Sequence, residues 1–139
     1  ISGPSEYEIM RTNSIAKKNR AIQTKLEKVI SYTKQTMVAY MSEEELNRLC
    51  AYIVEYSSGD TLQKISPVKV DSQLKSIDIM HFGWNIGKAF GRKRIHTATF
   101  IKNVFAHTLC DVEISTIERK MSHTESECHI ELDKMWKRH

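Results

Sequence analysis

The chain has 139 residues, of which 40% are hydrophobic and 27% are charged, and its formal net charge at pH 7 is +4. This composition is too apolar for a disordered chain, and no apolar run approaches the roughly 18 residues that a membrane-spanning helix needs. We therefore expect one folded structural unit, with an N-terminal helical region over residues 1–60 and a second helical region over residues 61–139.

The cysteines favour a cytoplasmic location. Cys50, Cys110 and Cys128 are odd in number and contain no CxxC pair, which suits free thiols in a reducing compartment better than a disulfide scaffold. Residues 1–4 also lack the basic and apolar leader of a secretory signal.

The N-terminal region predicts two helices. Residues 5–40 contain no proline or glycine after Pro4, and apolar residues recur there at helical spacing, as they do in one long helix or two shorter ones. Ser42-Glu43-Glu44-Glu45 is a capping box, in which the hydroxyl and the Glu45 carboxylate each accept from a backbone amide. The helix that follows is expected to stop at Gly59.

Three more helices are expected in the second region. Asp71 or Ser72 caps the first, a buried helix whose Gly83 and Gly87 permit close approach of a neighbour or mark a bend. His96 or Thr97 caps the next, which continues to Leu109, and a short turn over residues 110–112 leads to a last helix capped by Asp111. Residues 65–70 and 128–132 are the candidates for a short β element.

Positive charge is unevenly distributed along the chain. Seven basic residues and one acid lie between Ile9 and Ser42, and residues 79–110 hold five basic residues and no acid. Two basic segments separated by acidic ones suit the neutralisation of phosphates, although solvated helix faces give the same pattern.

Residues 105–121 resemble the second and third helices of bacterial helix-turn-helix DNA-binding domains. The likeness rests on Phe105-Ala106 and Leu109 in the first helix, and on Ser115-Thr116-Ile117 and Arg119 in the second. A small residue such as Ala106 lets two helices cross closely, and the second helix exposes short polar and basic side chains. The turn is about one residue longer than the tightest form, and Cys110 stands where glycine is common.

This resemblance implies a DNA-binding surface. We expect Arg92, Lys93 and Arg94 to hold phosphates beside the outer face of the last helix. Acidic residues around that helix, such as Glu113 and Glu118, would oppose binding. The residues expected to approach base edges are Ser115, Thr116, Arg119 and Lys120.

A second likeness concerns Met80 to Gly87 followed by the helix over residues 100–109. This arrangement is similar to small uncharacterised proteins of bacterial mobile elements. It implies no functional residue.

Catalytic and metal-binding motifs are not evident. No phosphate-binding glycine loop, GxSxG motif or metalloprotease His-Glu pair is present, and His81 is interpreted as a packing histidine. His107 and Cys110 are expected to share a helix face, but nothing orients them as a thiol–imidazole pair. Cys110, His123, Cys128 and His129 lack the close pairs of structural zinc sites. We expect no enzyme, no cofactor, no metal and no small-molecule substrate.

The sequence as a whole predicts a mainly α protein, a bundle of about five helices with a helix-turn-helix-like pair near the C-terminus. The preferred function is a non-enzymatic, DNA-binding regulatory protein. The alternative is a helical interaction module that assembles with itself, as a homo-oligomer, or with a protein partner through the N-terminal helix.

Overall fold

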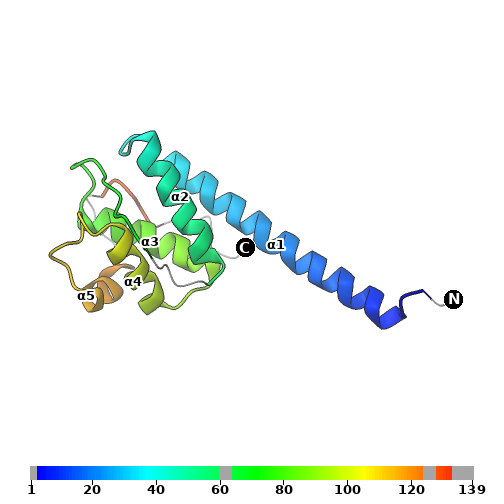
Figure 1. The fold of residues 1–139 in the computed structure, drawn as a ribbon. Coiled ribbons are helices and arrows are strands. Elements are labelled where there is room, and N and C mark those ends of the chain that lie inside the picture. The colour runs from blue at the N-terminus through cyan, green and yellow to red at the C-terminus, as the bar shows by residue number, and fades with distance from the viewer. Residues whose placement is uncertain (1–2, 60–63, 124–127, 133–139) are drawn as a thin grey trace.

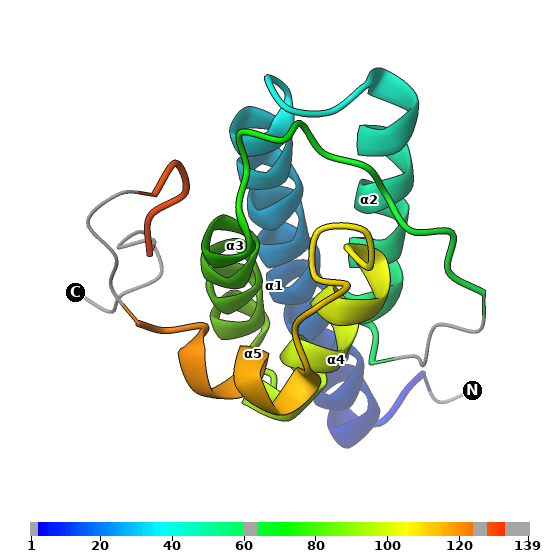
Figure 2. The same cartoon turned by 90° about the vertical axis from the view of Figure 1, so that its left-hand side faces the viewer.

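The computed structural model describes residues 3–59, 64–123 and 128–132. Within these ranges the chain forms five α-helices, as the mainly α prediction requires (Figure 1). Figure 2 shows α1, α2 and α3 side by side, with α4 and α5 packed across the face nearer the viewer. The helices are α1 (Glu6–Met37), α2 (Glu43–Ser57), α3 (Ser76–Phe90), α4 (Arg94–Val104) and α5 (Ile114–Lys120).

Neither segment proposed as a β element is a strand, and the described part of the chain contains no sheet. Residues 65–70 run alongside the helices, where Val68 is buried and its amide donates to the carbonyl of Val104 at 2.8 Å. Residues 128–132 bury Ile130 in the same manner. In both segments the backbone partners are a helix end or side chains rather than another strand.

Helix α1 is much longer than the surface against which it packs. Ser5 caps its start by accepting from the amide of Glu8 at 3.1 Å, and the helix then runs for 32 residues. Only Val29, Thr33 and Met37 near its C-terminal end are buried. The N-terminal part therefore projects beyond the bundle (Figure 1).

The start and end of α2 follow the sequence closely. The Ser42 hydroxyl accepts from the Glu45 amide at 3.2 Å, and Gly59 takes the left-handed conformation with φ 85° just after the helix ends. The prediction that the Glu45 carboxylate completes the capping box by accepting from a backbone amide at the helix start is wrong. The Glu45 carboxylate instead accepts from Arg48 Nη2 at 3.0 and 3.1 Å and from the Lys69 amide at 2.6 Å, so it fastens the loop after α2 to the helix.

Helix α3 lies at the centre of the core, and its glycines face α4. A Cβ atom built on Gly83 would lie 2.7 Å from Ile101 Cδ1, and one built on Gly87 would lie 2.8 Å from Thr97 Cγ2. Such separations are closer than carbon atoms tolerate. The prediction that these glycines permit a close helix approach is confirmed.

The expected polar caps of the last three helices are wrong. Lys75 precedes α3, Lys93 precedes α4 and Glu113 precedes α5, and none of the three side chains makes a cap hydrogen bond. At α3 the amide of Lys75 donates to Asp78 Oδ2 at 2.9 Å, so an acid inside the first turn does the capping. Asp71 closes a separate turn by accepting from the amide of Gln73.

A buried polar stripe on α3 holds residues 129–131. Asp78 Oδ1 accepts from the amides of His129 at 2.6 Å and Ile130 at 3.0 Å, and Asn85 Nδ2 donates to the carbonyl of Glu131 at 2.9 Å. His81 lies between them, with Nδ1 2.7 Å from the carbonyl of Ile130 and Nε2 2.6 Å from that of His123. The interpretation of His81 as a packing histidine is confirmed, since it is buried with both ring nitrogens in contact with backbone carbonyls.

Candidate nucleic-acid interface

The three cations around the start of α4 have separate roles. Arg92 turns toward α2, where Nη2 donates to the carbonyls of Tyr56 at 3.2 Å and Ser57 at 2.8 Å. Its guanidinium carbon also lies 5.8 Å from the centre of the Tyr56 ring. A cation at the C-terminal end of a helix satisfies its last carbonyls and favours the helix dipole. Arg92 therefore joins α2 to the bundle.

Arg94 satisfies the last carbonyls of α5 in the same way. Its Nη2 donates to the carbonyls of Glu118 and, at 3.4 Å, Arg119, and its Nη1 donates to Ser122 Oγ at 3.1 Å. The same guanidinium lies 5.2 Å from the centre of the Trp84 ring. One side chain thus brings the end of α5 against the aromatic side chain of α3.

Lys102 is a third cation that holds backbone carbonyls. Its ammonium donates to Leu109 at 2.6 Å, Cys110 at 3.3 Å and Val112 at 2.7 Å. These three carbonyls all belong to the connection between α4 and α5. Three of the five basic side chains in the acid-free stretch are therefore occupied in fixing helix ends and a loop.

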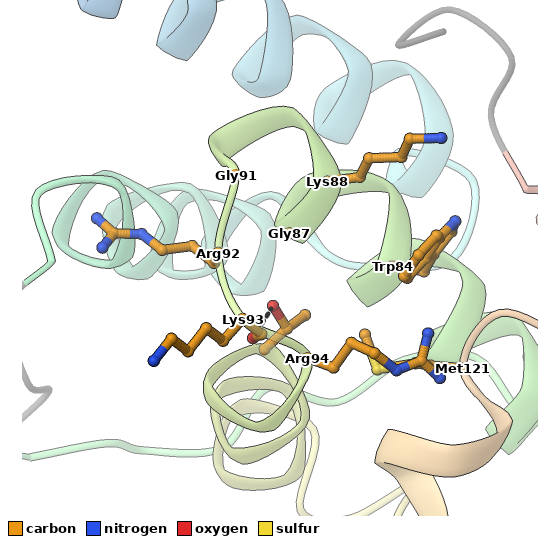
Figure 3. Close-up of a pocket in the computed structure, with 9 residues that line it drawn as sticks. Trp84, Gly87, Lys88, Gly91, Arg92, Lys93, Arg94 and Met121 are labelled. Atoms are coloured by element: carbon orange, nitrogen blue, oxygen red, sulfur yellow. Dashed lines mark hydrogen bonds between the residues drawn. The ribbon is translucent and has the colours of Figure 1, made fainter.

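Arg92, Lys93 and Arg94 all line one pocket, but their charged ends do not form one phosphate clamp. Arg92 and Lys93 point to one side of the α3–α4 junction, and Arg94 points to the other (Figure 3). Lys93 is exposed, whereas both arginines are partly covered. Only Arg94 lies beside α5 as expected.

The connection between α4 and α5 differs from the predicted short turn. Helix α4 ends at Val104 rather than Leu109, so nine residues separate the two helices. Phe105 and Leu109 still enter the core, but as parts of consecutive turns that Lys102 holds in place. The predicted turn over residues 110–112 is the end of this longer connection. For the same reason His107 and Cys110 do not share a helix.

The outer face of α5 carries the predicted polar residues. Ser115, Arg119 and Lys120 are exposed and Thr116 is half-buried, while Ile117 fills the core. Helix α5 lies at the end of the molecule away from the N-terminus of α1 (Figure 1).

Lys88 and Arg94 lie over the Trp84 ring, and Arg94 also donates to the end of α5, which carries Arg119 and Lys120. We call these five residues the Trp84 patch: Trp84, Lys88, Arg94, Arg119 and Lys120. Lys88 Nζ lies 5.8 Å from the centre of the Trp84 ring. Beside it is a pocket of about 370 Å³ that is open toward solvent (Figure 3). Among the described residues its lining includes Gly87, Gly91, Arg92, Lys93 and Arg94 and no acidic side chain. Sequence reasoning missed Trp84 and Lys88, although their spacing of four residues on one helix is a usable signal.

Thiols and metal ligands show no comparable arrangement. Burial raises the pKa of the Cys50 thiol above its ordinary value, and the Lys34 charge opposes this only in part, so the thiol is less nucleophilic at neutral pH. Cys110 is exposed. In residues 3–59, 64–123 and 128–132, no three His, Cys, Asp or Glu side chains group as a metal site.

Comparisons of the chain with protein-family models, with curated proteins and with solved structures found no match. Among the described residues, no helix is both long enough and apolar enough to cross a membrane.

Proposed function

We propose that this protein is a non-enzymatic helical DNA-binding protein that contacts phosphates through the Trp84 patch. The observation that carries the proposal is the Arg94 guanidinium, which joins the Trp84 ring to the C-terminal end of α5. Lys88 on α3 lies over the same Trp84 ring, and Arg119 and Lys120 are exposed on α5. Clustered Lys and Arg side chains neutralise phosphates, and this gives binding without sequence information.

In this proposal the outer face of α5 approaches base edges. Ser115 and Thr116 offer short hydroxyls, and Arg119 offers a guanidinium that can pair with a guanine edge. Lys88 and Lys120 contact the DNA backbone, and Arg94 positions the end of α5 beside the Trp84 ring. Arg92 has no part in DNA binding, because its hydrogen bonds and its contact with Tyr56 commit it to the end of α2.

The test replaces Lys88 and Lys120 together with glutamine and measures binding of a fluorescently labelled duplex by anisotropy at several salt concentrations. Both lysines are exposed, so the fold is expected to survive. Removing two phosphate contacts should reduce the slope of log K against log salt by about two and weaken binding to every sequence alike.

The matched control is Lys64→Gln with Lys69→Gln, two exposed lysines on the segment that follows α2. It removes the same charge from the chain, and the salt slope of the wild type should persist. Equal losses of affinity in the two double variants would show that the effect comes from net charge alone. Unchanged binding in Lys88→Gln with Lys120→Gln would show that the patch is not part of the interface.

A further inference from the structure

The N-terminal part of α1 is a helix without support from the bundle. We call residues 6–27 the arm, and none of them is buried (Figure 1). An isolated helix of about this length is marginally stable in water, because it has no tertiary packing to stabilise it. Except at Leu26, which packs against the core where the arm meets the bundle, the arm has free surface on all sides within the described structure.

One face of the arm continues the face that packs in the core. Ile15, Ile22 and Val29 are seven residues apart, which is close to two helical turns, so they lie in line. Val29 is 0% exposed, whereas Ile22 is 59% and Ile15 is 47% exposed. Leu26, between them, is half-buried. We call Ile15, Ile22 and Leu26 the arm stripe. The arm stripe continues the core face of α1 along the exposed part of the helix. Burying its apolar surface against a partner would lower the free energy.

The two borders of the arm stripe differ in charge. Arg11, Lys18 and Lys25 also repeat every seven residues, which sets them in a row along one border. The other border carries uncharged Thr12, Asn19 and Gln23. Residues 9–26 hold five basic side chains and no acidic one.

A second copy of the chain fits this surface poorly. In an antiparallel pair the same border of each helix faces its counterpart, so the row of Arg11, Lys18 and Lys25 would oppose itself. In a parallel pair the bundle that covers Val29 and Met37 would occupy the space needed by the partner's bundle. Repulsion disfavours the first arrangement and steric overlap disfavours the second.

We propose that the arm docks an acidic amphipathic helix of a different protein. That helix has apolar residues at steps of three and four, which interlock with Ile15, Ile22 and Leu26, and Asp or Glu residues along the flank that faces Arg11, Lys18 and Lys25. A nucleic acid would neutralise the basic row but leave the isoleucines exposed, so a protein helix fits the face better. The arm projects from the bundle and α5 lies at the other end of the molecule (Figure 1). This inference does not depend on DNA binding.

The test uses two synthetic helical peptides of about 21 residues as probes. Both carry leucine at the apolar positions, and one carries glutamate and the other lysine along the flanks. Calorimetric titration into the whole chain should detect the acidic peptide and not the basic one. Failure of the acidic peptide to bind, or equal binding of both, would overturn the proposal.

Variants then identify the face. Ile15→Ser with Ile22→Ser should weaken binding of the acidic peptide by about tenfold or more, since two apolar contacts are lost. Lys18→Glu with Lys25→Glu should abolish it and allow the basic peptide to bind. Lys17→Glu with Arg20→Glu changes the charge equally on the opposite face, and should keep the affinity within about threefold. Equal losses in the two charge variants would contradict the proposed face.

Two other occupants of the arm, a second copy of the chain and DNA, are tested with the same variants. Sedimentation of the wild type should show a monomer, and a dimer that Ile15→Ser with Ile22→Ser dissociates would replace the partner with a second copy. Labelled duplex should bind these serine variants as it binds the wild type, and a loss there would assign the arm to DNA instead. The substitutions lie outside the core, so circular dichroism should show the bundle still folded with unchanged cooperative melting.

Discussion

Replacing Gly87 with valine is expected to destabilise the fold by about 3 kcal/mol or more, because the new side chain overlaps α4. Its Cβ alone would lie 2.8 Å from Cγ2 and 3.1 Å from Cβ of Thr97. Thr97 cannot yield easily. It is buried, and its hydroxyl lies 2.6 Å from the Tyr56 hydroxyl and donates to the carbonyl of Lys93 at 3.2 Å. Urea unfolding followed by circular dichroism measures the loss.

Gly91→Ala is the comparison for this experiment. No residue other than its chain neighbours lies within 4 Å of a Cβ built on Gly91, but its φ of 67° is one that other residues adopt at a cost. Its replacement should therefore cost about 1 kcal/mol, through the backbone alone. If Gly87→Val were as stable as Gly91→Ala, α3 and α4 would not be in the close contact described.

Replacing Asp78 with alanine is expected to cost about 4 kcal/mol, because three backbone amides lose their acceptor together. Two of these amides belong to His129 and Ile130, and the third is that of Lys75 at the start of α3. Asp78 is 1% exposed, so water does not replace the carboxylate without rearrangement. Chemical unfolding gives the size of the loss, and hydrogen exchange at residues 129–131 shows where it occurs.

Asp78→Asn separates these roles. One carboxamide oxygen can still accept from His129 and Ile130, while the amide group cannot accept from Lys75. The substitution should cost about 1 kcal/mol and keep residues 129–131 protected from exchange. Protection that persists in Asp78→Ala would show that Asp78 is not what holds this segment.

Helix positions were predictable where local chemistry decides them. Ser42 and Gly59 mark the ends of α2 because a hydroxyl cap and a left-handed glycine act within a few residues. The C-terminal end of α4 was not predictable in this way. The apolar spacing continues through Phe105 to Leu109, but Lys102 holds three carbonyls of that segment in turns, and nothing in the local pattern indicates this contact.

The basic stretch shows the same limit for the candidate site. A row of arginines suggests phosphate binding, yet Arg92 and Arg94 each donate to the carbonyls of a different helix end. The sequence gives the number of charges but not their partners. The carbonyls that Arg92 and Arg94 contact belong to residues 24 to 36 positions away along the chain. The useful part of the prediction was the outer face of α5, where Ser115, Arg119 and Lys120 are exposed.

The most direct test of DNA binding at the Trp84 patch is the fluorescence of Trp84 itself. Trp136, the other tryptophan, lies outside the described residues and is replaced with phenylalanine to leave a single reporter. Titration with duplex DNA should change the Trp84 emission to saturation, and the midpoint should move to higher DNA concentration as salt is raised. Constant Trp84 emission at DNA concentrations where anisotropy shows the protein to be bound would contradict the account. A protein that binds no DNA at any concentration would contradict it as well.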